Sequence, residues 1–511
     1  MRQILNRPWL GAVISGLLMY MAICQINFWV SWICYVPFFI SIYNKSAKKV
    51  STSALILGFT FSCLAFSWMI PGAQRFTGYN ILYGAGIFII SAAFFSLYAA
   101  CLLYSFALLK ENSGHVNSIL KNGILAGCIF CVGEALLMTV SSGFPWFDIH
   151  SGNGLAENKY AIQPAAFFGI HIMTFVVVMV NYLFAVFIAK KLWQKLYTPV
   201  SIVIVYLLAG FFMFRNFETR SPGSKTFNVA ILAENFLPDI AWDNNTGNIL
   251  VQKLLDLNHQ AVTLNADMAL WSESAIPWTY RKDDDLVRAV FKITDPARIT
   301  HIMGINTAYN GNNVFNSAYC ILPGEIVAGR YDKQHLLSFI ERPFNGWIMP
   351  FFSSNGYAVV KDLEHSTPLT TPYGKAGLLI CNEAAIPGAA ARQVNQGAEF
   401  FMNMSNDGWF NDTYIVQLHF YYARLRAVES RKDIAINCNN GFSGLVKASG
   451  NIEVKEQSTE PFVKMVTVQP NKVITLHSSY PAIFSCGCVI YIVILIMSRF
   501  VKKQSQSSKQ P

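Results

Sequence analysis

Three residues that could together perform acyl transfer stand at corners of the chain that we assign to strand ends. They are Glu273, Lys333 and Cys381. A cysteine attacks a carbonyl carbon once a base has taken its proton, and a carboxylate can be that base. A lysine can stabilise the oxyanion that then forms, and the backbone N–H of Asn382, directly after the cysteine, is a candidate second donor. The sequence therefore contains a candidate Glu-Lys-Cys acyl-transfer site.

Each of these residues also has a purely structural explanation. Cys381 could be a small buried thiol at a strand end, because free cysteine is among the most buried residue types. Glu273 could be a carboxylate at a helix N-terminus, and Lys333 could be a solvated lysine at a strand end. Residue types and spacing alone leave both interpretations open.

The segment that holds these residues, 221–475, has the pattern of an α/β domain. Short apolar runs bounded by polar residues, glycine or proline predict strands, and they lie at 226–232, 268–271, 299–305, 315–322, 376–380, 399–404 and 434–438. Helical patterns occur between several of them, at 245–257, 284–293, 386–396 and 414–430. This alternation indicates a sheet covered by helices, in which reactive residues usually lie at strand ends.

The rest of the chain is too apolar for a soluble protein. Of the 511 residues, 53% are hydrophobic and 13% are charged, whereas soluble domains carry about 25% charged residues. Eight apolar stretches approach the ~20 residues that a helix needs to cross a bilayer: 9–23, 26–43, 52–70, 82–109, 122–141, 164–188, 199–214 and 479–500. Only 25–27 divide the first two, so one long tilted span, and seven spans in all, is an alternative.

Basic residues are unevenly distributed over the short loops. With the N-terminus in the cytoplasm, the outer loops carry two, Arg75 and Lys159. The inner segments carry 14: Arg2, Arg7, Lys45, Lys48, Lys49, Lys110, Lys121, Lys190, Lys191, Lys195, Arg499, Lys502, Lys503 and Lys509. This positive-inside bias places 221–475 outside the cytoplasm. It also accounts for the net charge of +10 without a nucleic-acid partner.

The cysteines indicate neither a metal nor a cofactor. Three of the eleven lie in the external segment: Cys320, Cys381 and Cys438. An odd number outside the cytoplasm leaves at least one free thiol. The pairs Cys128/Cys131 and Cys486/Cys488 have a metal-like spacing, but they lie in apolar stretches without histidine or carboxylate partners, so we expect them to serve packing.

Several motifs, taken in order, resemble the nitrilase-like carbon–nitrogen hydrolase superfamily and its Glu-Lys-Cys triad. They are WSESAIP at 271–277, YDKQHL at 331–336, LLICNEA at 378–384, NMSNDGWF at 403–410 and HFYYARLRAVESRKDIAINCNNGFSG at 419–444. Together with the eight apolar stretches around this segment, the motifs resemble one family of the superfamily in particular, the apolipoprotein N-acyltransferases. SGFPW at 142–146, with Ile162-Gln163, Gly169, Thr174-Phe175 and Asn181, is similar to that family's loop and sixth span.

The resemblance implies a reaction. In the family, the cysteine takes an acyl chain from a phospholipid, usually phosphatidylethanolamine, as a thioester. The α-amine of a lipoprotein's diacylglyceryl-cysteine then accepts the chain as an amide. For this chain the resemblance implies Glu273 as base, Lys333 as oxyanion stabiliser and Cys381 as nucleophile. It adds supporting carboxylates and aromatic residues near the acyl or headgroup site, namely Glu341, Glu383, Trp242 and Trp409.

The resemblance also implies a layout in the bacterial inner (cytoplasmic) membrane. We expect a membrane domain with seven spans at 1–220, a periplasmic catalytic domain with an αββα sandwich at 221–475, a last span at 476–500 and a cytoplasmic tail at 501–511.

This sequence departs from the family pattern at several positions. Ser272 and Ser338 stand where the family commonly has proline, and Asn382 stands where an aromatic residue often follows the nucleophile. The carboxylate of Glu134 lies inside an apolar stretch, which suggests a function, with a neutral, hydrogen-bonded packing role as the alternative.

After Lys333 comes a loop-like stretch rich in large apolar side chains, including Phe339, Phe344, Trp347 and Phe351. Soluble domains rarely expose such a patch without a partner. We interpret it as an arm that dips into the outer leaflet and binds acyl chains, with buried core as the alternative.

Two other functions compete with acyl transfer to lipoproteins. The same triad with water as acceptor would make a membrane-anchored nitrilase-type amidase, although eight spans exceed what an anchor requires. A transporter or sensor is the non-enzymatic alternative, and the few intramembrane charges and the intact triad count against it.

Overall fold

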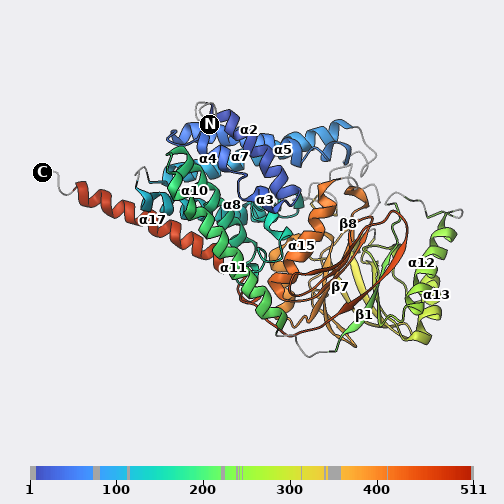
Figure 1. Ribbon diagram of the computed structural model, residues 1–511. Helices are drawn as coiled ribbons and strands as arrows, with labels where there is room; N and C mark the ends of the chain where they lie inside the picture. The colour runs from blue at the N-terminus through green and yellow to red at the C-terminus, as the bar shows by residue number, and fades with distance from the viewer. Residues whose placement is uncertain are drawn as a thin grey trace.

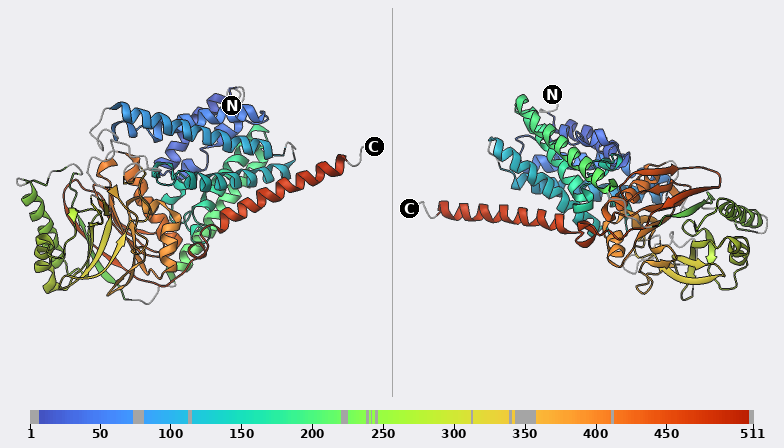
Figure 2. Two further views of the ribbon diagram at one scale, coloured as in Figure 1. Left: turned by 180° about the vertical axis from the view of Figure 1, so that it is seen from behind. Right: turned by 60° about the horizontal axis from the view of Figure 1, so that its bottom comes forward.

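The computed structural model describes residues 7–72, 81–111, 115–219, 225–237, 240, 242–243, 246–311, 313–338, 341–342, 358–410 and 413–507. A helical part, made by residues up to 219 and by the last helix, lies beside a part built on two β-sheets (Figure 1). The last helix, α17 (Ile483–Ser507), leaves the sheets and extends outward along the helical part (Figure 2).

The helical part consists of α2 (Pro8–Met19), the π-helix η1 (Tyr20–Cys24), α3 (Phe28–Ser31), α4 (Val36–Ser41), α5 (Ala47–Ala65), α7 (Ile81–Leu109), α8 (Val116–Val140), α9 (Ala165–Phe168), α10 (Ile170–Ala189), α11 (Tyr197–Thr219) and α17. Within the described residues, five helical segments are long and apolar enough to cross a membrane: Ile81–Leu109, Val116–Val140, Ile170–Ala189, Trp193–Thr219 and Ile483–Val501. The last two expose most of their apolar side chains to the outside of the chain, as expected of helices that face lipid.

No continuous helix runs through the first two apolar stretches. Ile26 has a left-handed backbone conformation with φ of +50°, which ends the helical run from Pro8 to Cys24. The Oδ1 atom of Asn27 then accepts the N–H of Val30 at 3.0 Å and caps α3. The predicted stretch 26–43 is thus divided between two short helices, and the single long helix considered as an alternative is not formed.

Two sheets make the other part. The nine-stranded sheet has β1 (Phe227–Ala233), β2 (Met268–Leu270), β3 (Ile276–Thr279), β4 (Thr300–Ala308), β5 (Asn313–Phe315), β6 (Ser317–Leu322), β7 (Ile326–Asp332), β8 (Ala358–Val359) and β15 (Phe462–Val468). The six-stranded sheet has the order β14 (Ile452–Glu456), β13 (Ser443–Val446), β12 (Ile434–Asn439), β11 (Phe400–Asn406), β10 (Gly374–Ile380) and β9 (Leu369–Thr371).

The central strands of each sheet are parallel and apolar on both faces. β1, β2 and β4 pair in parallel in one sheet, and β10, β11 and β12 do so in the other. Strands covered on both faces read as continuous apolar runs, which is why the sequence predicted them. Antiparallel strands, including β7, β13, β14 and β15, flank them, and the sequence pattern missed these four. Most side chains of β7 and β14 are exposed or half-buried, so these two strands do not read as apolar runs.

The sheets pack face to face and helices cover their outer faces. Side chains of both sheets, among them Ile231, Leu270, Leu378 and Met402, form one fully buried core. The helices α12 (Gly247–Thr263) and α13 (Asp285–Thr294) cover the first sheet, and α14 (Pro387–Asn395) and α15 (Tyr414–Ser430) cover the second. This is an αββα sandwich.

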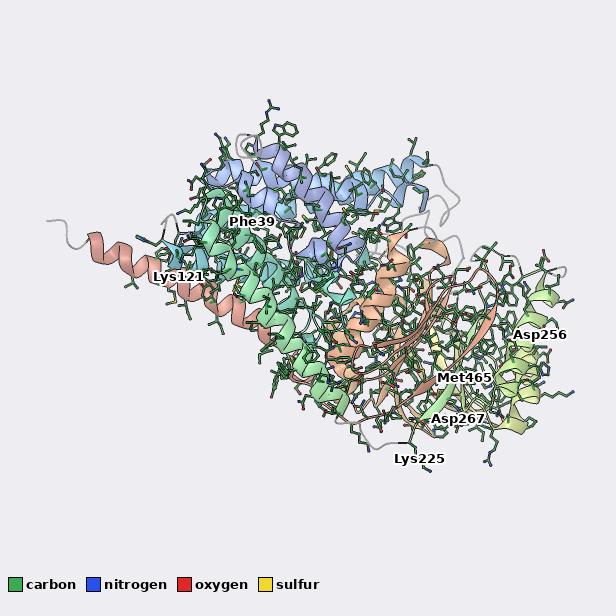
Figure 3. All side chains as sticks on the ribbon, viewed as in Figure 1. Phe39, Lys121, Lys225, Asp256, Asp267 and Met465 are labelled. Atoms are coloured by element: carbon green, nitrogen blue, oxygen red, sulfur yellow. The ribbon has the colours of Figure 1, made fainter. Side chains whose placement is uncertain are left out.

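The helix α15 lies between the second sheet and the helical part (Figure 1). Nη1 of Arg424 donates to the carbonyl oxygens of Ala156, at 2.8 Å, and Glu157, at 2.7 Å. The hydroxyl of Tyr422 donates to the carbonyl of Asp148. These bonds attach the sandwich to the loop that follows α8. In Figure 3, Phe39 lies within the helical part, whereas Asp256 on α12 is at the opposite, solvent-exposed side of the sandwich.

Glu134 has a structural role in the same region. One oxygen lies 3.0 Å from Nδ1 of His150 and accepts the hydroxyl of Thr174 at 2.7 Å, and the other accepts the N–H of Ser151 at 2.8 Å. The carboxylate therefore fixes the loop onto which α15 docks, and its contacts include the hydrogen bonds that the packing interpretation expects.

Candidate active site

The carboxylate of Glu273 and the ammonium of Lys333 meet where two strands of the nine-stranded sheet end. Glu273 follows β2, and Lys333 follows β7 directly. Nζ of Lys333 lies 3.2 Å from Oε1 of Glu273, and the lysine is only 1% exposed. A charge buried to this extent must be paired. Lys333 is therefore not a solvated strand-end lysine.

A second carboxylate, that of Glu341, completes the environment of the ammonium. Its Oε1 lies 2.8 Å from Nζ of Lys333, and its Oε2 accepts the N–H of Leu337 at 2.8 Å. Nδ2 of Asn316 donates to Glu273 at 2.8 Å and reaches Glu341 at 3.4 Å. Burial alone would lower the pKa of the Lys333 ammonium, but the negative groups around it, Cys381 first and the two carboxylates next, raise this pKa well above its usual value.

Cys381 lies at a sharp corner after β10 of the six-stranded sheet. It begins the short 3-10 helix η6 (Cys381–Ala385) and has φ of +54°. A non-glycine residue in this region costs of order 1–3 kcal/mol, and such residues cluster at functional sites. Burial raises the pKa of the thiol well above its usual value; the charge of Glu273 adds to this rise and that of Lys333 opposes it. The thiol thus keeps its proton until a base removes it.

Glu383 connects the nucleophile corner to the lysine corner. Its Oε1 accepts the N–H groups of Gln334, at 2.7 Å, and His335, at 3.2 Å. Its Oε2 accepts the N–H of Ile380 at 2.9 Å, and the hydroxyl of Tyr331 reaches both oxygens. The side chain is fully buried. Burial raises its pKa, and these hydrogen bonds oppose the rise.

These contacts leave the Glu383 carboxylate no free face for a substrate amine. We therefore assign Glu383 a positioning role. Asn382 is also buried, and its Nδ2 donates to the carbonyl of His335 at 3.1 Å. This contact adds a second link between the two corners, and the Asn382 backbone N–H stays a predicted oxyanion donor.

Sequence reasoning missed Asp407 and His419, although both belong to motifs that carry the resemblance. The backbone N–H of Asn406, at the end of β11, donates to Oε2 of Glu273 at 3.2 Å. Asp407 is fully buried and accepts the hydroxyl of Ser405 at 2.9 Å, and its Oδ1 lies 2.8 Å from Nδ1 of His419. Although burial alone would lower it, the neighbouring Asp407 charge raises the pKa of His419. The pair closes the site on the α15 side.

Of the four residues predicted to bind substrate, the structure describes the side chain of Trp242 only. Trp242 packs edge-to-face against Phe236 and Trp278, in the aromatic cluster outside the first sheet. The backbone of Trp409 lies in the 3-10 helix η7 (Gly408–Phe410), and its side chain is not among those described. Phe339 and Trp347, like the other aromatic residues of the predicted arm, Phe344 and Phe351, lie outside the described residues.

An apolar cleft opens between the helical part and the sandwich. Its walls come from both. The helical part contributes Trp68, Met69, Gly72, Ile87, Pro145, Trp146 and Ile149. The sandwich contributes Leu337, Ala385, Phe410, Tyr414, Ile415, Leu418, His419 and Tyr422. Ala385 ends the short helix that Cys381 begins, so one wall of the cleft belongs to the same helix as Cys381.

Possible metal ligands also have other partners. The carboxylates of Asp332 and Asp362 and the ring of His365 lie close enough to share a cation. Nη2 of Arg330 is already 2.9 Å from Asp332 and 3.1 Å from Asp362, so a guanidinium balances this cluster. All eleven cysteines are free thiols in the structure, and Cys128, Cys131 and Cys488 pack in one apolar cluster.

Comparison with known proteins gives the family. Residues 15–183 match the apolipoprotein N-acyltransferase N-terminal domain, and residues 240–476 match the carbon-nitrogen hydrolase family. The chain is 23% identical over 511 residues to the apolipoprotein N-acyltransferase of Geobacter metallireducens, with 98% of this chain and 96% of that protein covered. The chain belongs to the apolipoprotein N-acyltransferase family.

Other relatives have the same name. The apolipoprotein N-acyltransferase of Agrobacterium fabrum is 28% identical over 371 residues, which cover 69% of this chain and 68% of that protein. Among solved structures, Nit3 of Saccharomyces cerevisiae, a member of the nitrilase superfamily, matches with a TM-score of 0.39 and 16% identity over 51% of this chain and 95% of that one. The predicted family and the predicted fold class, several apolar helices joined to a nitrilase-like domain, are confirmed.

Proposed function

We propose that this protein transfers an acyl chain from a membrane phospholipid, through a thioester on Cys381, to the N-terminal α-amine of a lipoprotein's diacylglyceryl-cysteine. The observation that carries the proposal is the buried ammonium of Lys333, held between two carboxylates beside the strained Cys381 corner. The names of the relatives agree with it. Phosphatidylethanolamine is the proposed donor.

In the first half-reaction Glu273 removes the proton of the Cys381 thiol, and the sulfur attacks the ester carbonyl of the donor. The oxyanion forms beside Lys333, whose charge stabilises it. Collapse of the intermediate breaks the bond between the carbonyl carbon and the glyceryl oxygen. The leaving alkoxide takes the proton from Glu273, so the products are a lysophospholipid and the thioester.

In the second half-reaction the α-amine of the acceptor attacks the thioester carbonyl. Glu273 takes a proton from the amine nitrogen as the new carbon–nitrogen bond forms. The carbon–sulfur bond then breaks, and Glu273 returns the proton to the departing thiolate of Cys381. The enzyme recovers its starting state, and the acceptor carries an amide.

The apolar cleft supports a lipid donor. A cleft whose walls are almost wholly apolar suits an acyl chain, since burial of each CH₂ group contributes about 0.8 kcal/mol. Because both parts of the protein form it, a chain can pass from the helical part towards Cys381 without entering water. A soluble amide substrate would not require this path.

Contacts between the two parts support a periplasmic catalytic domain in the inner membrane. Residues that the charge bias places at or near the outside touch the sandwich: Tyr414 donates to the carbonyl of Ala65, at the end of α5, at 3.0 Å, and Arg424 donates to the carbonyl of Glu157, in an outer loop, at 2.7 Å. At the other end Arg499 donates to the carbonyl of Leu109, so two segments assigned to the inside also meet. We propose eight spans, with the domain limits expected from the sequence.

The function can be tested with the full-length protein in nanodiscs that contain phosphatidylethanolamine with an alkyne-labelled acyl chain. We expect hydroxylamine-labile label on the wild-type protein, and transfer of this label to a diacylglyceryl-cysteine peptide. Cys381→Ala and Glu273→Gln should prevent both. Cys320→Ala, which changes a buried thiol in β6, is the matched control and should retain both.

Two outcomes would contradict the proposal. Labelled Cys381→Ala protein would show that another residue is the nucleophile. Release of free fatty acid, with no acylated peptide although acceptor is present, would indicate a hydrolase of the nitrilase type.

A further inference from the structure

A second, polar cavity of about 300 Å³ lies beside the nucleophile corner, between the helical part and the sandwich. This volume is at the lower end of the range of small-molecule sites, about 300–1,000 Å³. Its walls are Met138, Ser142, Gly143, Pro145, Asp148, Gln334, His335, Leu336, Arg342, Lys361, Asn382 and Ile386. Asn382 is the residue after Cys381, so the cavity reaches the site of the chemistry.

The cavity carries both signs of charge, on different walls. Arg342 and Lys361 come from the sandwich and have exposed side chains. Asp148 comes from the loop after α8 and is buried. Burial raises the pKa of Asp148 to about 7, and His150 opposes the rise.

Two amides on the sandwich wall have unused acceptors. Within the described part of the chain, neither Oε1 of Gln334 nor Oδ1 of Asn382 accepts a hydrogen bond. Both residues are buried, and buried polar atoms normally have a partner. The wall therefore offers acceptors in addition to the carboxylate.

The polar cavity and the apolar cleft lie on two sides of the same segments. Leu336 lines the cavity and Leu337 lines the cleft, and within η6 Asn382 lines the cavity and Ala385 the cleft. Pro145 lines both. A phospholipid has its reactive ester between an apolar chain and a polar headgroup, so a lipid that occupies both spaces presents this ester at the corner between them, where Cys381 lies.

We propose that the polar cavity binds the headgroup of the acyl donor, its phosphodiester through Arg342 and Lys361 and its amine through Asp148. The inference rests on the proposed function, because the donor must be a phospholipid. Arginine and lysine are the side chains that bind phosphate, and a zwitterionic headgroup matches a cavity with two cations and one carboxylate. A diacylglyceryl-cysteine acceptor, by contrast, presents an amine but no phosphate, so it would leave the two cations unpaired.

Binding is tested without turnover on the Cys381→Ala protein. Native mass spectrometry compares bound phosphatidylethanolamine with bound phosphatidylglycerol of identical chains, in the background of Cys381→Ala and with Arg342→Gln and Lys361→Gln added. We expect the double substitution to weaken binding of both lipids about tenfold, the scale of a lost charged hydrogen bond. Asp148→Asn should remove the preference for the ethanolamine lipid and leave the glycerol lipid unchanged.

Turnover supplies the second measurement. With Cys381 intact, the double substitution should slow thioester formation from either phospholipid about tenfold. It should not slow thioester formation from a p-nitrophenyl ester of the same fatty acid, which has no phosphate. Lys282→Gln removes an exposed charge elsewhere on the sandwich and is the matched control.

The outcomes separate the two proposals. Unchanged lipid binding in the Cys381→Ala background refutes the headgroup site, whatever the reaction is. Equal slowing with the p-nitrophenyl ester also refutes it, because the substitutions then disturb the triad. Normal thioester formation with slow transfer to the peptide would assign the cavity to the acceptor. No thioester on the wild-type protein from any donor would refute the proposed function, and the binding measurement would still decide the headgroup site.

Discussion

The role of Glu383 can be tested by a substitution that keeps its shape. Glu383→Gln retains one acceptor oxygen and replaces the other by an NH₂ group. The carboxylate accepts Gln334 and His335 on one oxygen and Ile380 on the other. The amide oxygen can therefore accept the N–H groups on only one of these two sides. On the other side, the NH₂ group of the glutamine would meet a backbone N–H, so two donors would face each other.

The magnitude follows from these bonds. A hydrogen bond to a charged group contributes about 1.5–3 kcal/mol. Burial disfavours the charge of Glu383, as its raised pKa indicates. The neutral glutamine avoids this unfavourable burial, which offsets part of the stability lost with the hydrogen bonds. We expect Glu383→Gln to lower the free energy of unfolding by about 2 kcal/mol.

Activity should decrease by more than stability predicts. Ile380 precedes the nucleophile and Gln334 follows Lys333, so the carboxylate sets the separation of sulfur and ammonium. A displacement of about 1 Å at a catalytic site can slow a reaction about 100-fold. Thioester formation from a p-nitrophenyl ester should therefore slow by about 10- to 100-fold, with the protein still folded in detergent. Glu364→Gln, at an exposed carboxylate, is the control and should change neither quantity.

Two results would refute this reasoning. If Glu383→Gln forms the thioester at the wild-type rate but transfers it slowly to the peptide, the carboxylate contacts the acceptor amine. If thioester formation is lost with no change in stability and is restored at higher pH, Glu383 acts as a proton carrier. Either result would replace the positioning role by a chemical one.

Four further outcomes are expected. Cys381→Ser should form almost no acyl-enzyme, because a serine hydroxyl is a poor nucleophile without stronger activation, whereas Cys438→Ala should keep a thioester detectable by intact mass. Lys333→Met should slow thioester formation roughly 100- to 1,000-fold, the cost of one oxyanion donor; a smaller loss would place the oxyanion elsewhere. Burial raises the pKa of Glu234 from 4.5 to about 7, so the folded protein holds a proton that the unfolded chain releases. The contribution of Glu234 to stability should therefore fall by roughly 3 kcal/mol as the pH rises from below 4.5 to above 7, and Glu234→Gln should reduce the pH dependence of unfolding across that range by this amount. A reporter fused after Arg220 should be active only outside the cytoplasm, and activity inside would refute the charge-based orientation.

The sequence predicted those elements whose burial produces a regular pattern. The central strands are covered on both faces and read as apolar runs, so β10 and β11 were found within a few residues of their observed limits. Strand β7, which Lys333 directly follows, exposes the side chains from Ile326 to Ala328 and carries Arg330 and Asp332. The alternation of apolar and polar residues in this strand is too weak to predict a strand from the sequence. Lys333 was placed at a strand end only from its neighbouring residues and from the resemblance.

The sequence predicted the helix α15 but not its surroundings. Arg424, Arg426 and Glu429 would ordinarily mark a solvated face, yet all three are buried. Arg426 pairs with Glu429 at 2.9 Å within the helix, and Arg424 donates to carbonyl groups of the helical part. The carbonyl partners of Arg424 are about 270 residues away in the chain, so no local sequence pattern could reveal them.

The site was predicted as three residues and is observed as a closed network. The triad could be named because Glu273 and Cys381 follow apolar runs and Lys333 belongs to the motif YDKQHL, but Asn316 lies between two strands and carries no comparable signal, although it donates to Glu273. The role of Glu383 depends on backbone N–H groups of two separate loops, which a sequence does not display. Motifs can predict which residues act together in a site. The hydrogen bonds that hold these side chains in place depend on the fold.

The position of this network explains why the helical part must do more than anchor the enzyme. A thioester that waits for a lipoprotein amine is exposed to hydrolysis by water, which is far more abundant than the acceptor. The sandwich alone would leave the nucleophile corner open on the side where Trp146, Pro145 and Ile149 now form the wall of the cleft. Closing an active site excludes water and prevents such side reactions. If Cys381 carries the thioester as proposed, the loop fixed by Glu134 connects the membrane helices to the chemistry: it holds the apolar wall that would admit an acyl chain and keep water from the thioester.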